Sequence, residues 1–167
     1  MARLRISVWE SPHIQAVILA MRGMDKELSA QIRKATKTVT TAEWKTAVED
    51  HASTALERRT LVATARVAVS NKNVSLRAGQ LAKKTSGGGK TYQLTPAVEF
   101  GADPERTIPS HKGATRYERK LGGAFKPRNK KGYVAYPAAA DIIPRIAALW
   151  VATVVRTFHE AVEKGTR

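Results

Sequence analysis

The chain of 167 residues contains no cysteine, which excludes disulfide bonds and thiolate metal sites. It also lacks a continuous run of the ~18 apolar residues that a membrane span requires. The best candidate, Ile14 to Met21, contains Gln15 and ends at Arg22. The same segment lacks the basic start and the small-residue cleavage site of a signal peptide. We therefore expect neither a membrane segment nor cysteine-based chemistry.

Acidic residues are scarce, because 14 Asp and Glu stand against 29 Lys and Arg and give a formal net charge of +15. Such an excess attracts nucleic acid, acidic protein surfaces or anionic membranes, but it says little about the fold. The charged and apolar fractions, 26% and 43%, are those of a soluble globular protein. The length predicts one domain, residues 1–167, with a single core.

Helical spacing of apolar residues marks two long segments. Polar and apolar residues alternate in 3–9, which predicts a short strand or an extended arm. Ser11-Pro12 is typical of a helix start. We therefore assign 1–23 to an N-terminal arm and a short helix. Apolar residues then recur at steps of three and four up to Val39, which predicts a long helix over roughly 24–55, bent near Thr40. A second apolar helix follows Tyr136-Pro137.

Residues with a period of two lie between these helices. They occur in 61–69 and 74–78 on either side of the turn residues 70–73, which predicts a hairpin. A third strand is expected at 91–100, where Pro96 indicates an edge or a bulge. A last short strand is expected at 133–136. The predicted fold is α+β, with a long N-terminal helix and a C-terminal helix packed on a small curved antiparallel sheet.

Residues 102–132 have no periodicity and are predicted to form a long, flexible, basic loop, which in a compact domain is usually functional or disordered. Tyr117 and Phe125 lie among its cations, a mixture that suits the stacking of bases and the binding of phosphates. We favour a protein contact that orders upon assembly, and DNA binding is the second interpretation. The candidate contact residues are Arg116, Arg119, Lys120, Lys126, Arg128, Lys130 and Lys131.

Enzymatic motifs are weak. The stretch 86–91 resembles a phosphate-binding loop, but Lys84 stands where the first glycine belongs and a strand is expected to follow, so we expect no nucleotide cofactor. The four histidines are scattered, which predicts no metal site, and no Ser-His-Asp arrangement can be assigned. We expect Glu99 to be an ordinary solvated carboxylate, with a partner contact as the alternative. We expect Phe100 to anchor the core and Gly101 to turn the chain with positive φ. No catalytic residue is assigned, and the chain is not expected to be an enzyme.

The order of these elements resembles the neck proteins of long-tailed bacteriophages, also called tail-completion or head–tail joining proteins. The resemblance is carried by Glu99-Phe100-Gly101 at the end of the expected third strand and by Tyr136-Pro137 before the last helix. It implies a structural virion protein that forms a ring, a hexamer or a dodecamer. The ring would contact other connector and tail proteins, and DNA passing through the channel is a further expected partner. It implies a location in the virion neck, after assembly in the host cytoplasm. The alternatives are a basic nucleic-acid-binding accessory protein and a tail terminator.

Overall fold

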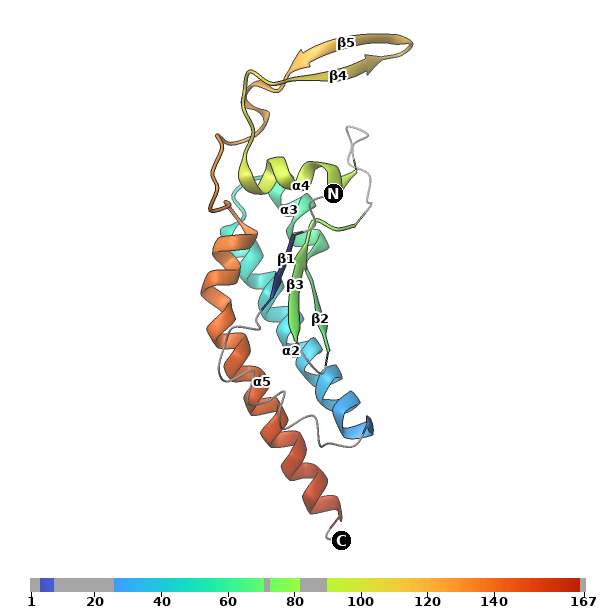
Figure 1. The fold of residues 1–167 in the computed structure, drawn as a ribbon, viewed down its shortest axis with the longest axis vertical. Helices are drawn as coiled ribbons and strands as arrows, with labels where there is room; N and C mark the ends of the chain where they lie inside the picture. The colour runs from blue at the N-terminus through green and yellow to red at the C-terminus, as the bar shows by residue number, and fades with distance from the viewer. Residues whose placement is uncertain (1–3, 8–25, 71–72, 82–89, 166–167) are drawn as a thin grey trace.

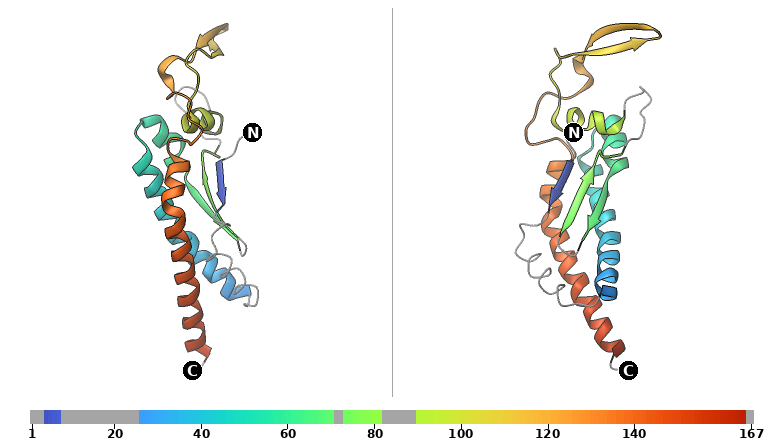
Figure 2. Two further views of the ribbon diagram at one scale, coloured as in Figure 1. Left: turned by 60° about the vertical axis from the view of Figure 1, so that its left-hand side comes forward. Right: turned by 45° about the vertical axis from the view of Figure 1, so that its right-hand side comes forward.

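The computed structural model describes residues 4–7, 26–70, 73–81 and 90–165. Two long helices lie side by side on one face of a small sheet, and a two-stranded ribbon projects from one end of the elongated molecule (Figures 1 and 2). The predicted α+β fold, with its two long helices and antiparallel sheet, is confirmed. The elements are β1 (Leu4–Ser7), α2 (Lys26–His51), α3 (Ala55–Thr60), η1 (Val62–Thr64), β2 (Arg66–Val69), β3 (Val74–Ala78), α4 (Thr91–Phe100), β4 (Thr107–Lys112), β5 (Thr115–Lys120), η2 (Gly122–Ala124) and α5 (Ala135–Gly165).

The three-stranded sheet has the order β1-β3-β2, with both pairs antiparallel. The predicted hairpin is present, although its first strand is shorter than expected because residues 61–65 complete α3 and η1. Val67 pairs with Leu76 and Val69 with Val74 in the β2–β3 register. These pairs face the helices, since Val67, Val74 and Leu76 belong to the hydrophobic core.

Helix α2 is continuous from Lys26 to His51, within the range expected from the sequence. Its buried face runs through Ser29, Ile32, Thr36, Thr40, Trp44 and Val48, at steps of three and four. The expected stripe is therefore only partly right: Ile32 is buried, but Val39 is 39% exposed. Trp44 secures the helix to the sheet, because its indole Nε1 donates to the carbonyl of Arg77 at 3.1 Å. The stripe through Ile14 to Met24 lies outside the described residues.

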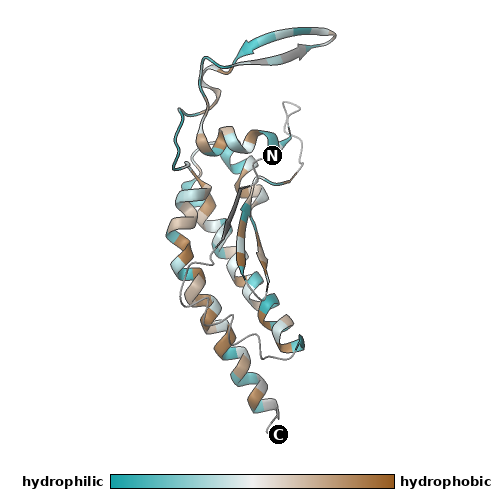
Figure 3. Ribbon diagram, viewed as in Figure 1, coloured by the Kyte–Doolittle hydropathy of each residue, from teal (hydrophilic) through white to brown (hydrophobic). Residues whose placement is uncertain are grey.

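Helix α5 supplies the other half of the helical layer. Ile146 and Trp150 are fully buried. Residues Ala135–Glu160 are long and apolar enough to cross a membrane, but a soluble core helix meets the same criterion, and 44% of the most apolar window is buried here. The C-terminal end of α5 extends past the N-terminal end of α2 (Figure 1). In this part of α5, Val155 and Phe158 are 52% and 49% exposed. The core therefore sits where α2, α5 and the sheet meet (Figure 3).

Two expected strands are wrong. Residues 91–100 form helix α4, because Thr91, Thr95 and Val98 are buried at steps of four and three, a helical spacing that overrides the local strand pattern. Pro96 lies inside this helix rather than at a sheet edge. Residues 133–136 also form no strand. Helix α5 begins at Ala135, which places Pro137 in the first turn, where its missing N–H costs nothing.

The basic segment 102–132 is also more regular than predicted. It contains the ribbon, defined here as residues 107–120, in which β4 and β5 pair antiparallel from Thr107–Lys120 to Lys112–Thr115. The helix η2 follows it. Gly113 turns the ribbon with a φ of +61°, a conformation that glycine adopts without strain.

Candidate functional site

Glu99 lies at the centre of the corner formed by residues 99–101. Its side chain is 0% exposed. Its carboxylate accepts from the backbone N–H groups of Ala135 at 2.8 Å and Tyr136 at 2.9 Å, and its carbonyl accepts from Tyr133 N–H at 2.9 Å. The prediction of a solvated carboxylate is wrong, because Glu99 binds the free amides and positive dipole at the start of α5.

Two glycines allow this close approach. At Gly132, φ is +79° and a Cβ would lie 2.3 Å from Glu99 Oε1. At Gly101, φ is +71° as predicted, and a Cβ would lie 2.0 Å from the Pro127 carbonyl oxygen. The chain therefore packs backbone against backbone at Gly101 and backbone against the Glu99 carboxylate at Gly132, which no side chain at these glycines would permit.

Phe100 packs beside the start of α5 rather than in the centre of the core. It is half-buried, with its ring centroid 5.4 Å from that of Tyr136 at an interplanar angle of 53°. Its carbonyl accepts from Asn129 N–H at 2.8 Å. Pro137 follows Tyr136 in the first turn of α5 and is half-buried. The five residues predicted as a structural motif thus meet at one place, although the corner ends a helix and not a strand.

The sequence predicted that Lys126 contacts a partner or DNA, but in the structure its ammonium group is bound within the fold. Its Nζ is 2.7 Å from Glu57 Oε1 and 3.0 Å from Ser53 Oγ, and it lies 4.9 Å from the centroid of the Tyr133 ring. Its side chain is 34% exposed. This cation ties the returning basic segment to α3 and contributes to internal stability.

Glu57 receives more than this ion pair. It closes a capping box at the start of α3, where its Oε2 accepts from Thr54 N–H at 2.8 Å and from Ser53 N–H at 2.8 Å. Burial raises the pKa of the Glu57 carboxyl, but the bonds from Lys126 and from these two N–H groups outweigh it and hold the pKa below its usual 4.5. The spacing Thr54-x-x-Glu57 is a sequence signal for this cap.

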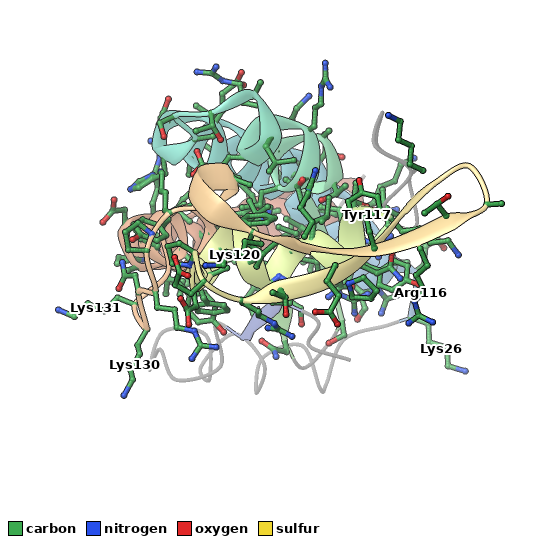
Figure 4. The ribbon with its side chains drawn as sticks, turned by 90° about the horizontal axis from the view of Figure 1, so that it is seen from above. Lys26, Arg116, Tyr117, Lys120, Lys130 and Lys131 are labelled. Atoms are coloured by element: carbon green, nitrogen blue, oxygen red, sulfur yellow. The ribbon has the colours of Figure 1, made fainter. Side chains whose placement is uncertain are left out.

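The remaining candidate cations form two groups. Arg116, Arg119 and Lys120 lie on the exposed strand β5, where Lys120 pairs with Glu105. Arg128, Lys130 and Lys131 are exposed in the loop before α5. In Figure 4, Lys130 and Lys131 lie at the opposite side of the molecule from Arg116 and Tyr117. The basic segment is therefore continuous in sequence but is not one binding surface.

The elements beside the glycine-rich stretch 86–91 bear on its resemblance to a phosphate-binding loop. A helix, α4, follows the glycines, so the objection that a strand follows is wrong. Lys84 still replaces the first glycine of the motif, and residues 82–89 lie outside the described part of the chain. Thr91 is 2% exposed, and its hydroxyl donates to the carbonyl of Leu81. That hydroxyl is engaged within the fold, whereas a phosphate-binding loop uses it to hold Mg²⁺.

Histidines and carboxylates gather into no metal-binding group of three within the described residues. His51 Nε2 is 3.2 Å from Asp141 Oδ2 and links the end of α2 to α5. His159 is exposed on α5, and His13 lies outside the described residues. A pocket between α3, α4 and η2 is lined by Thr54, Leu56, Glu57, Ala97, Val98, Gly123, Ala124, Phe125 and Lys126. Its only charged pair, Glu57 and Lys126, is already joined.

No protein-family model, curated protein or solved structure matches this chain.

Proposed function

We propose that this chain is a structural subunit of a phage head–tail connector, a neck or tail-completion protein that works in an oligomeric ring. The observation that carries the proposal is the projecting ribbon. Every ribbon side chain that the structure describes is exposed, including all six residues of β5. An isolated two-stranded hairpin is marginally stable in water, so such a ribbon gains stability when another surface covers it.

A ring supplies such a surface without leaving free edges. In a head-to-tail ring the ribbon of one subunit lies on a different region of the next, and the closed ring covers both. Tyr117, 42% exposed among the cations of β5, is suited to anchor this contact. The exposed apolar side chains of α5, Val155 and Phe158, are a second surface that contacts with connector or tail proteins would bury.

The internal use of the polar residues supports a structural role over a catalytic one. Glu99 caps α5, Glu57 caps α3, and Lys126 joins the basic segment to the body. The order of elements, with a long helix, an antiparallel sheet and an apolar final helix, also supports the neck-protein reading. The corner supports it less than expected, because it ends a helix.

The proposal is tested by removing the ribbon. Replacing residues 107–120 by a short Gly-Ser turn should leave the far-UV circular dichroism spectrum and Tm close to those of the parent, while native mass spectrometry shows loss of the ring. Tyr117→Asp should weaken the ring, whereas Thr46→Asp, at an exposed position on α2, should not. A parent protein that stays monomeric at all concentrations, also with connector proteins added, would contradict the proposal.

Lysates of a phage lacking this gene test the biological role. Negative-stain electron microscopy should reveal full heads beside finished, unattached tails. Normal joined particles would remove the joining role. Tails of uncontrolled length would instead favour the tail-terminator alternative.

The second candidate is a nucleic-acid-binding accessory protein. It is favoured by the net charge of +15 and by exposed cations on α2, including Lys34, Lys37 and Lys45. Such binding weakens steeply as salt increases, because phosphate contacts release counterions. Normal joining by a variant neutralised at Arg116, Arg119, Lys120, Arg128, Lys130 and Lys131, together with loss of DNA binding, would favour this candidate.

A further inference from the structure

The pocket between α3, α4 and η2 has the size and the walls to receive one aromatic side chain. Its walls are mainly apolar, with Leu56, Ala97, Val98 and Phe125 among them. The charged pair in it, Glu57 and Lys126, is already joined and offers no free charge to a ligand. Its volume is about 290 Å³. Sites for small molecules typically measure about 300–1,000 Å³, so a pocket just below this range suits a single large side chain.

The ribbon carries a side chain of this kind. Tyr117 is 42% exposed, and tyrosines that fill pockets are among the strongest anchors of protein interfaces. Side chains alternate between the two faces of a strand, so Thr115 and Arg119 share the face of Tyr117, whereas Glu118 lies on the other. Lys112 pairs with Thr115 and therefore also lies on the face of Tyr117. One face of the ribbon is thus a tyrosine accompanied by two cations.

Tyr117 cannot fill the pocket of its own chain. Strand β5 is extended up to Lys120, so Tyr117 is held about 10 Å away along the strand, and η2 begins only two residues after Lys120. Figure 4 shows Tyr117 further toward the tip of the ribbon than Lys120. The tyrosine is therefore directed away from η2, and only a second copy can present it to the pocket.

The positions of the two surfaces suit a closed ring. The ribbon, α3 and α4 lie at the same end of the elongated molecule (Figure 1). A head-to-tail contact between two surfaces at the same height is repeated by rotation about an axis parallel to the molecule, which closes a ring. A contact between opposite ends would instead add copies as an open filament.

The charges near the pocket set the direction of the ribbon. Glu49 and Asp50 are exposed in the last turn of α2, shortly before α3, where the negative end of the α2 dipole also lies. Arg58 and Arg59 are exposed further along α3. The cations that accompany Tyr117 are therefore attracted to the α2 side of the pocket and repelled from the end of α3.

We propose that Tyr117 of one copy fills the pocket between α3, α4 and η2 of the next copy, with Arg119 and Lys112 turned toward the end of α2. This contact rests on the proposed ring and names the two surfaces that form it. Lys126 lines the pocket, so its ion pair with Glu57 holds the base of the ribbon and also shapes the surface that receives the next ribbon.

Cross-linking between copies tests the contact, because the chain has no cysteine and introduced thiols are the only ones present. Thr115→Cys places a thiol on the face of Tyr117, and Gly123→Cys places one at the pocket, where a new Cβ has nothing within 4 Å. The two variants are mixed while dilute, concentrated and treated with a short bismaleimide. The mixture should give a covalent dimer, whereas each variant alone should give none. The control mixture of Thr115→Cys with Thr46→Cys, exposed on α2, should also give none.

Filling the pocket is the second measurement. Ala97→Trp should raise the Kd of ring assembly, followed by native mass spectrometry, about tenfold or more, whereas Ala42→Trp, at an exposed position on α2, should change it little. Circular dichroism shows whether Ala97→Trp folds, and the cross-linking result decides alone if it does not.

The outcomes separate this contact from the ring itself. A parent protein that forms no ring would contradict the assembly role. If the parent forms rings, normal assembly of folded Ala97→Trp or absence of the mixed dimer would overturn the pocket contact alone. Covalent dimers from Thr115→Cys by itself would also overturn it, because they would show two ribbons meeting across a two-fold axis.

Discussion

Removal of the Glu99 carboxylate tests the central structural claim, that a buried residue of α4 caps α5. In Glu99→Ala, the N–H of Ala135, a residue 1% exposed, loses its acceptor. Leaving a buried N–H without a partner costs about 1–3 kcal/mol, and the Tyr136 N–H adds a smaller cost because it is partly buried. Loss of the single Cγ methylene adds ~1 kcal/mol. We expect a total of about 4 kcal/mol.

The assay is urea unfolding at pH 7, followed by far-UV circular dichroism. A loss of about 4 kcal/mol corresponds to a fall in Tm of roughly 8–16 °C for a chain of this length. Glu99→Gln keeps the shape and one acceptor but turns an amide N–H₂ toward the other donor, so it should cost about 2 kcal/mol. The control Glu105→Ala, with an exposed carboxylate, should cost less than about 0.5 kcal/mol.

Hydrogen exchange makes the test residue-specific. The amides of Ala135 and Tyr136 should lose protection in Glu99→Ala before the centre of α5 does, because only the cap is removed. The reasoning would be refuted if Glu99→Ala cost less than ~1 kcal/mol or left both amides as protected as in the parent.

Three further predictions concern the same region. Because the folded-state pKa of Glu57 lies below its usual 4.5, the carboxylate stabilises the fold above pH 4.5, and this contribution is lost as pH falls below that value. Lys126→Met should therefore lower the free energy of unfolding at pH 7. The variant should also lose less of that free energy than the parent between pH 5 and about pH 3. An unchanged pH profile would contradict this. Phe100→Ala should cost about 2 kcal/mol by urea unfolding, less than the ~3 expected for a core aromatic, because Phe100 is half-buried; an unchanged Tm would refute its packing role. Gly132→Ala should lower Tm at least as much as Glu99→Ala, because the new Cβ meets the Glu99 carboxylate at positive φ, and parent-like stability would show that the segment relaxes freely.

Elements with a clear period could be predicted from the sequence. Helix α2 lies within the predicted range 24–55, and the β2–β3 hairpin surrounds the turn residues. Helix α4 could not be predicted, because its ten residues fit either period and Pro96 disfavours the interior of a helix. Buried Thr95 favours the helix in the folded protein, because its hydroxyl donates to the carbonyl of Gly79, a contact that depends on the tertiary fold.

The candidate site was predictable in its residues but not in its roles. The corner was identified from its sequence, yet only the fold could bring Glu99 beside Ala135, 36 residues later in the chain. Lys126 looks like its neighbouring cations until Glu57 is placed opposite it. The pairing of Arg66 with Arg77 was missed because cross-strand register is not visible along a single strand.

The base of the ribbon is held by the fold, which changes how assembly should depend on mutation. Backbone bonds join Leu121 N–H to the Arg106 carbonyl and Ala102 N–H to the Lys126 carbonyl, at 2.9 and 3.0 Å. A ribbon fixed at its base loses less conformational entropy on docking than the flexible loop predicted from the sequence. Variants of the ribbon surface such as Tyr117→Asp should therefore weaken the ring without lowering Tm. Lys126→Met should lower both, because it loosens the base. If Lys126→Met lowered Tm but left the ring intact, the direction of the ribbon would not matter, and assembly would have to depend on another surface, such as the exposed side of α5.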